Sequence, residues 1–159
     1  MRVNWANILE RLQAYPPCVN RVLSPCPEGR IGDVQAELGK FPEDLADMLK
    51  YFNGAELFTC TGPLVSIFMV STLPPLPPLE WAPDWCIDKY TPKWRSSGAD
   101  RERDWAIGMM NYGGLIVVTK GGAVREWDTA RRAWGSSIPS LGEWFEWILR
   151  EGDAYMKEV

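Results

Sequence analysis

Histidine is absent from this chain of 159 residues. Without an imidazole, the chain cannot form a Ser-His-Asp or Cys-His catalytic relay, a zinc site with a histidine ligand, or a histidine-based pH switch. Carboxylates, lysines, tyrosines and thiols can still support catalysis. The absence therefore favours a protein that is not an enzyme, without excluding one.

Positive charge is also in short supply. The chain has 17 lysines and arginines against 21 aspartates and glutamates, which gives a formal net charge of −4 and a sequence pI near 4.9. A protein that grips a nucleic-acid backbone normally carries the opposite balance. We therefore expect no nucleic-acid partner.

Cysteines are few and widely spaced, at Cys18, Cys26, Cys60 and Cys86. No C-x-x-C unit occurs, so we predict neither a zinc knuckle nor any other metal site, and no cofactor. Four cysteines are too few for a disulfide-stapled secreted domain, and the N-terminus lacks the apolar segment of a signal peptide. The longest apolar stretch, Pro63 to Val70, is far shorter than the roughly 20 residues of a membrane-spanning helix. These features predict a cytoplasmic protein with reduced thiols and no membrane segment.

Apolar residues three or four positions apart predict helices in the first third of the chain. Asn4 can cap the first helix, Gly39 can end the second, and Pro42 suits the first turn of the third. The predicted helices span residues 5–15, 31–38 and 42–52.

Strands dominate the remainder, where short glycine-rich connections favour antiparallel neighbours. Residues 73–83 are too rich in proline for a helix or an inner strand. A short helix over 84–90 and an exposed loop over 91–104 are expected next. The predicted strands are 56–60, 64–70, 105–111, 115–120, 123–127 and 132–134, and Ser140 begins a closing helix over 140–149.

Helices and strands do not alternate, which argues against a doubly wound parallel sheet. We predict an α+β fold: an antiparallel sheet with a four-strand meander, packed by N-terminal helices and a C-terminal helix. The whole chain, 1–159, is expected to form one domain. Its core would span about 31–149 and carry a proline- and tryptophan-rich insert over about 73–104.

A segment from Val34 to Leu45 reads Val-Gln-Ala-Glu-Leu-Gly-Lys-Phe-Pro-Glu-Asp-Leu, and an Asn-Gly pair follows the helix it begins. This run resembles the entry motif of the SUKH superfamily, the Smi/Knr-like proteins, and the later order of strands and closing helix is also similar. The insert from Leu73 to Trp94 matches no motif of that family. The residues that carry the resemblance are Leu38, Gly39, Pro42, Asn53, Gly54, Trp127 and Asp128.

The resemblance implies an α+β domain without a known catalytic constellation. Bacterial members of the family are typically immunity proteins that bind a polymorphic toxin, often a nuclease, and block it. Fungal relatives regulate cell-wall synthesis. We therefore expect a non-catalytic protein-binding domain whose partner is a basic toxin domain. The alternative is a regulatory or scaffolding module with no link to a toxin.

An acidic and aromatic segment of the insert is the candidate partner-binding surface. Tryptophans are favoured interface anchors, and neighbouring carboxylates could meet the cations of a basic toxin cleft. The competing interpretation is that the tryptophans pin the insert to the sheet. The candidate residues are Glu80, Trp81, Asp84, Trp85, Asp88 and Trp94.

Three further patterns have weaker functional interpretations. The proline run 73–79 could dock in an SH3-like groove, although a stiff connection explains it as well. Arginines interleaved with tryptophans over 93–134 could grip nucleic acid, but local acids favour salt bridges and cation–π pairs instead. Carboxylate pairs such as Glu143 and Glu146 could serve a glycoside hydrolase, yet such spacing is common on solvated helices.

Overall fold

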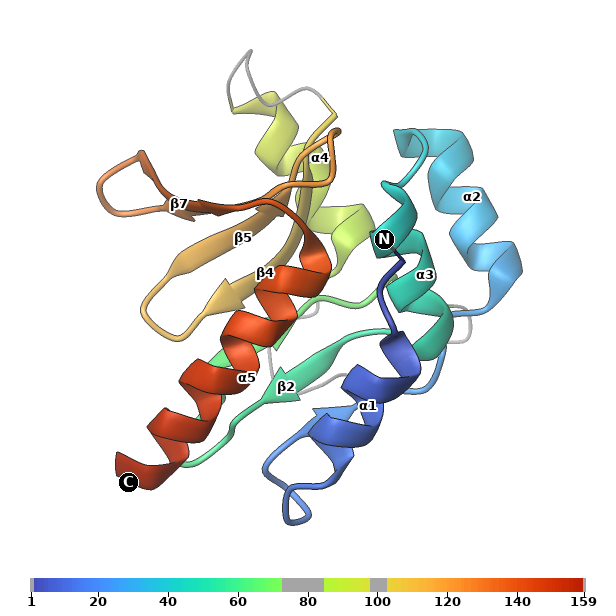
Figure 1. Ribbon diagram of the computed structural model, residues 1–159. Helices are drawn as coiled ribbons and strands as arrows, with labels where there is room; N and C mark the ends of the chain where they lie inside the picture. Colours follow the sequence, from blue (N-terminus) through green and yellow to red (C-terminus); the bar gives the residue numbers. More distant parts are fainter. Residues whose placement is uncertain (1, 73–84, 98–102, 159) are drawn as a thin grey trace.

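A computed structural model describes residues 2–72, 85–97 and 103–158 of the chain. Helices and strands follow the predicted order, with helices first, then strands, and a long helix at the end (Figure 1). The helices are α1 (Trp5–Gln13), α2 (Glu28–Leu38), α3 (Glu43–Tyr51), α4 (Ile87–Ser96) and α5 (Leu141–Glu158). The strands are β1 (Arg21–Val22), β2 (Ala55–Leu57), β3 (Val65–Ile67), β4 (Trp105–Met110), β5 (Gly114–Val118), β6 (Val124–Asp128) and β7 (Ala133–Ile138).

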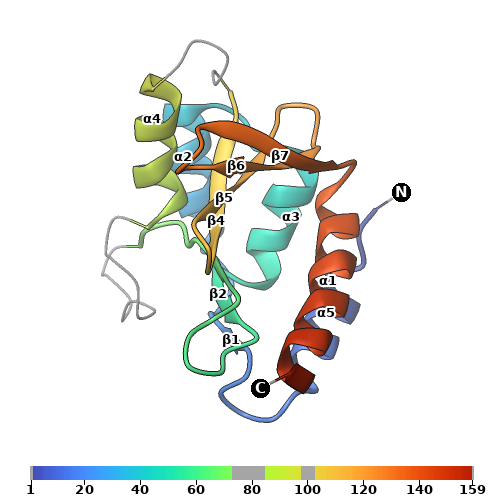
Figure 2. The same cartoon turned by 90° about the vertical axis from the view of Figure 1, so that its left-hand side faces the viewer.

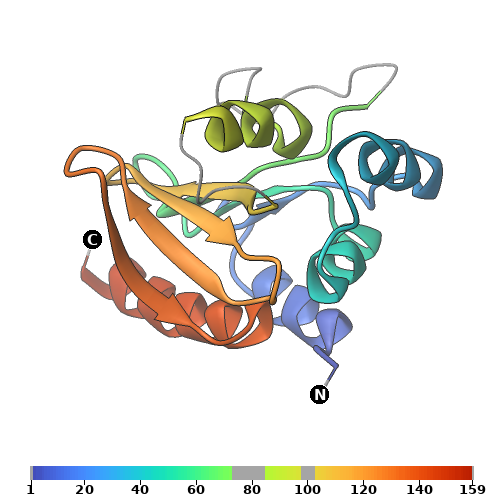
Figure 3. The same cartoon turned by 90° about the horizontal axis from the view of Figure 1, so that it is seen from above.

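The strands form one antiparallel sheet in which each strand pairs with its neighbours in the sequence, from β1 to β7. Helix α4 covers one face of the sheet, and α1, α3 and α5 lie on the other (Figures 2 and 3). Helix α2 packs against both α3 and α4. The predicted α+β class is confirmed, and the meander has seven strands in place of the four we expected.

The core lies mainly between the sheet and the α1–α3–α5 layer. Every residue of β2, β3 and β5 is buried, as expected for strands covered on both faces. Trp5 of α1 makes edge-to-face contacts with Phe52, at the end of α3, and with Phe145 of α5, at centroid distances of 6.1 and 5.2 Å. One aromatic cluster thus joins helices that are far apart in the sequence.

Asn53 and Gly54 connect the helical layer to the sheet. The buried Asn53 amide donates to the Val70 carbonyl oxygen at 2.9 Å and accepts from the Val70 N–H at 2.7 Å. Gly54 has a φ of +96°, and a Cβ there would lie 3.0 Å from the carbonyl oxygen of Ile67. These contacts therefore require an amide side chain at position 53 followed by glycine at position 54.

Helix α2 begins three residues before its predicted start, β2 and β3 are shorter than predicted, and four other elements differ more from the sequence-based expectation. Strand β1 was not predicted, because two residues carry no periodic signal. Helix α4 continues through Pro92, where we expected a loop, because Thr91 accepts a hydrogen bond from the Ala106 N–H and Trp94 is buried. Strand β7 extends to Ile138 and α5 extends to Glu158, nine residues past its predicted end.

Gly152 allows α5 to continue across the core. A Cβ at this position would lie 2.2 Å from the ring of Phe58, a buried residue that also contacts Tyr15 edge-to-face at 5.2 Å. A hydrogen bond adds to this contact, because the Tyr15 hydroxyl donates to the Asp153 carboxylate of α5 at 3.3 Å. The last turns of α5 are therefore held by the segment that follows α1.

Replacing Asn53 by alanine should destabilise the fold, because the buried N–H and C=O of Val70 would both lose their partner. We expect the free energy of unfolding to fall by at least about 2 kcal/mol in urea titrations followed by circular dichroism. Asn7→Ala, at an exposed position of α1, should change it by no more than about 0.5 kcal/mol. Equal stabilities for the two variants would contradict this role of Asn53.

Gly152→Ala should also destabilise the protein, by about 1–3 kcal/mol, because the added methyl group collides with the Phe58 ring. Gly32→Ala is the matched control, since Gly32 lies inside α2 with no atom within 4 Å of the new Cβ. That change should stabilise the helix by about 0.5–1 kcal/mol. Thermal unfolding of both variants measures the difference, and a Gly152→Ala protein as stable as wild type would show that the contact is unimportant.

Candidate partner-binding groove

An open groove of about 700 Å³ lies on the α4 face of the sheet. We call it the α4 groove. One wall comes from Trp85 and Tyr90 at the start of α4, and the opposite wall is the loop between β2 and β3. Its lining residues are Glu56, Thr59, Thr61, Gly62, Pro63, Ser66, Trp85, Tyr90, Met109, Met110, Asn111, Gly113 and Thr129.

Phe68, which is fully buried, packs against the Trp85 and Tyr90 rings that form the aromatic wall of the groove. Its ring lies 5.7 Å from the ring of Trp85 and 5.4 Å from that of Tyr90, both in tilted arrangements. Trp85 and Tyr90 are themselves only half-buried. Two large rings are thus fixed in place while part of their surface stays accessible, which is the property of a good interface anchor.

A second hollow of about 330 Å³ shares Tyr90 and Thr129 with the α4 groove and extends it along α4. Three tryptophan rings stand edge-to-face here, with centroids 5.1–5.7 Å apart. They belong to Trp94, Trp127 and Trp134. This cluster fastens α4 to β6 and β7, so most of its ring surface is used inside the protein.

Arginines stack on tryptophans in this region, as the sequence interpretation expected. The Arg125 guanidinium lies 4.1 Å from the ring centroid of Trp134, and that of Arg95 lies 4.4 Å from Trp105. Guanidinium groups held over indole rings contribute to packing. Their arrangement supports the structural interpretation of the arginine–tryptophan pattern.

The structure places the predicted partner-binding residues in different settings. Glu80, Trp81 and Asp84 lie outside the described residues. Trp85 lines the α4 groove.

Asp88 and Trp94 have internal roles instead. The Asp88 carboxylate accepts hydrogen bonds from Arg30 at 3.0 Å and from the Ser71 N–H at 2.9 Å, and its side chain is only 11% exposed. Trp94 is 4% exposed. Burial and internal hydrogen bonding explain why acidity and aromaticity alone did not identify a surface here.

Sequence reasoning missed Tyr90, Met109 and Met110 as groove residues. A tyrosine at the end of a short predicted helix and methionines in an apolar strand both read as ordinary core residues. Alternation along β4 carried the available signal, since Met109 pairs with Leu115 and Ser66 across the sheet and so shares their face. That face becomes a groove only because the start of α4 and the β2–β3 loop stand on either side of it.

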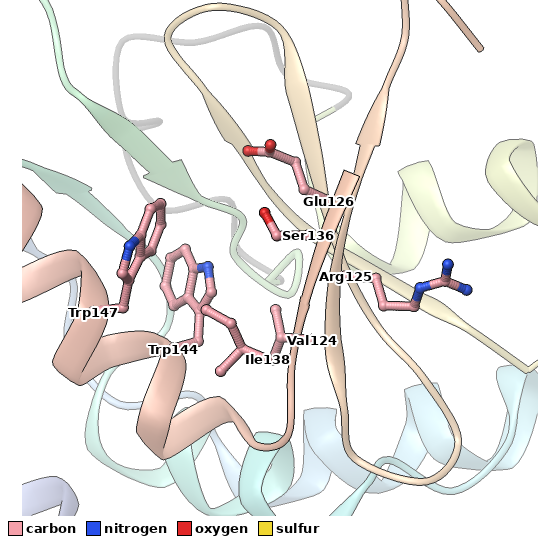
Figure 4. A pocket seen from close by; sticks show the side chains of 7 residues that line it. All are labelled: Val124, Arg125, Glu126, Ser136, Ile138, Trp144 and Trp147. Atoms are coloured by element: carbon pink, nitrogen blue, oxygen red, sulfur yellow. The ribbon is translucent and has the colours of Figure 1, made fainter. Parts of the chain in front are cut away.

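A smaller cavity of about 220 Å³ lies on the opposite face, between α5 and the last two strands. Figure 4 shows Trp144 and Trp147 of α5 on one side of these strands and the Arg125 side chain pointing to the other. Glu126 lies at this cavity and accepts a hydrogen bond from the Tyr112 hydroxyl. The cavity has room for little more than one side chain, so the α4 groove is the better candidate site.

The carboxylate pair on α5 gives no support to hydrolase chemistry. Glu146 forms a two-bond ion pair with Arg11, at 2.6 and 2.9 Å. These hydrogen bonds lower the pKa of Glu146, whereas a general acid needs a raised one. Within the described ranges, no group of three or more cysteine or acidic side chains is arranged to hold a metal ion.

No family model matches the chain, and no curated protein resembles it significantly. None of the helices that the structure describes combines the length and apolarity needed to cross a bilayer.

The internal role of Asp88 is testable by a double-mutant cycle with Arg30. Because the pair is mostly buried, we expect Arg30→Ala and Asp88→Ala to be coupled by about 1–3 kcal/mol in unfolding free energy. The control cycle pairs Arg2 with Glu43, whose side chains are 78% and 73% exposed, and should give at most about 0.5 kcal/mol. Similar coupling in the two cycles would remove the structural role that we assign to Asp88.

Proposed function

We propose that this protein is a non-catalytic protein-binding domain of the SUKH type, and that it acts as an immunity protein. In this proposal it binds a toxin domain stoichiometrically and covers the toxin's active cleft. The observation that supports binding is the α4 groove, where Trp85 and Tyr90 are braced by Phe68 yet remain half-exposed. The segment from Val34 to Gly54 resembles the entry motif of the SUKH superfamily, and this resemblance suggests the toxin partner.

The groove suits a protein partner in size and composition. Its volume of about 700 Å³ accommodates several side chains, and its walls include two aromatic rings and two methionine side chains. Methionine is common at surfaces that adapt to a partner, and aromatic rings contribute much of the binding energy in interfaces. Anchors of this kind chiefly slow dissociation, which a stoichiometric inhibitor requires.

Electrostatic attraction to a basic toxin is the second part of the proposal. The charged residues that line the groove and its extension are Glu56, Lys93 and Arg132, which have both signs. Glu80 and Asp84, the other acidic residues of the predicted partner-binding segment, lie outside the described residues. The net charge of −4 still favours encounter with a basic partner over long distances.

Co-expression with the toxin domain encoded beside the gene tests the proposal directly. Cells that produce the toxin should survive when this protein is present, and purified samples should form a one-to-one complex by light scattering. Failure to rescue and to form the complex would eliminate the immunity function.

Groove variants then locate the contact. Trp85→Ala and Tyr90→Ala should each weaken toxin binding at least tenfold in calorimetric titrations, because each removes an anchor ring. Tyr51→Ala is the matched control, since Tyr51 is an exposed aromatic residue on α3, away from the α4 face. If both groove variants bind as tightly as wild type while remaining folded, the partner docks elsewhere.

A further inference from the structure

A row of cross-strand neighbours forms the floor of the α4 groove and of the second hollow beside it. Glu56 of β2 lies opposite Ser66 of β3, which lies opposite Met109 of β4. The row continues through Leu115 of β5 to Trp127 of β6. Directly opposed residues point to the same face of a sheet, so these five side chains share the α4 face. Each of them lines one of the two hollows, which therefore form one continuous depression across five strands.

The charged residues of this depression are separated by sign. At one end, Glu56 is only 6% exposed and lines the α4 groove. At the other end, the exposed residues Lys93 and Arg132 line the second hollow. Among the described residues, these three are the charged ones that line the depression. A negative group and two positive groups therefore lie at opposite ends of one surface.

The two cations reach the second hollow from different elements. Tyr90, Lys93, Trp94 and Ser97 follow one another at steps of one to three and lie on one side of α4, where all four line this hollow. Lys93 lies almost one helical turn beyond Tyr90, which the two hollows share. Arg132 comes just before β7, the edge strand of the sheet. The positive end of the depression is thus built by helix and sheet together.

The length of the floor sets the spacing that a bound segment requires. Neighbouring strands lie about 4.8 Å apart, so Glu56 on β2 and Leu115 on β5 are separated by about 14 Å across the sheet. An extended chain advances about 3.3 Å per residue. A segment that crosses the strands would therefore span the distance between the two charged ends with about four to six residues.

We propose that the depression binds an extended protein segment that carries a basic and an acidic side chain about four to six residues apart. The basic side chain lies against Glu56, where the rings of Trp85 and Tyr90 attract its charge and cover its alkyl part. The acidic side chain pairs with Lys93 and Arg132 at the other end. This mode of binding rests on the proposed function and specifies the kind of segment that the groove accepts.

Selection from a library of random dodecapeptides displayed on phage tests this mode of binding without a toxin. Wild type should enrich peptides with a basic and an acidic residue about four to six positions apart. Glu56→Gln keeps the shape of the side chain and removes its charge, so this variant should lose the preference for the basic residue only. The double variant Lys93→Gln/Arg132→Gln should lose the preference for the acidic residue only. Circular dichroism of each variant checks its fold.

Titration of one enriched synthetic peptide gives the magnitude. Glu56→Gln and the double variant should each weaken binding about tenfold, because each removes a charged partner. Added salt should weaken the wild-type complex as well. Lys50→Gln is the matched control, since Lys50 is a half-exposed lysine of α3, on the opposite side of the sheet, and this change should leave the affinity unaltered.

Three results would overturn this mode of binding: enriched peptides without paired charges, the same charge preferences in wild type and both variants, or no enrichment by wild type. None of them bears on the toxin rescue experiment, which tests the proposed function separately. Paired-charge enrichment together with failed rescue would support the segment-binding role and remove the toxin as partner.

Discussion

The side-chain amide of Asn53 holds the helical layer and the sheet in their relative positions, and the rest of the structure depends on it. Val70 lies beyond the end of β3, and the Asn53 side chain supplies both a donor and an acceptor to its backbone. The backbone N–H of Asn53 meanwhile donates to the Ser24 carbonyl oxygen at 3.0 Å. One buried residue therefore fixes the end of α3, the segment before α2 and the continuation of β3. An apolar residue of similar size could fill the space, but it would leave the polar groups of Val70 unpaired.

The position of α4 on its face of the sheet depends on the contacts around Asn53 and Val70. Just beyond Val70, Ser71 donates its N–H to Asp88, which Arg30 of α2 also contacts. Helix α4 is thus tied to the core side at its first turn, and the tryptophan cluster around Trp94 ties its second half to β6 and β7. With both ends of α4 fixed, the space beside its start stays open as the groove.

The same restraints explain why function was harder to predict than fold. Three properties identified most elements in advance: the periodicity of apolar residues, the caps and the glycine turns. The acidic and aromatic character of the insert, by contrast, did not distinguish Trp85, which lines the groove, from Asp88 and Trp94, which are buried in internal contacts. Types of side chain describe what a surface could bind, whereas exposure depends on partners that are distant in the sequence.

The sequence by itself determined the α+β class and the antiparallel order of neighbouring strands, because these follow from local periodicity and from short glycine-rich turns. The need for Asn53 was decided by the tertiary structure, because its amide pairs with the backbone of Val70, 17 residues away in the sequence. Tertiary structure alone decided the continuation of α4 through Pro92 and of α5 past Leu149. Long-range packing stabilises these helical turns, which local helix propensity did not predict. The tertiary structure also decided which aromatic rings remain accessible. Exposure is a property of the whole packed molecule, so it can be read only after helix and sheet have come together.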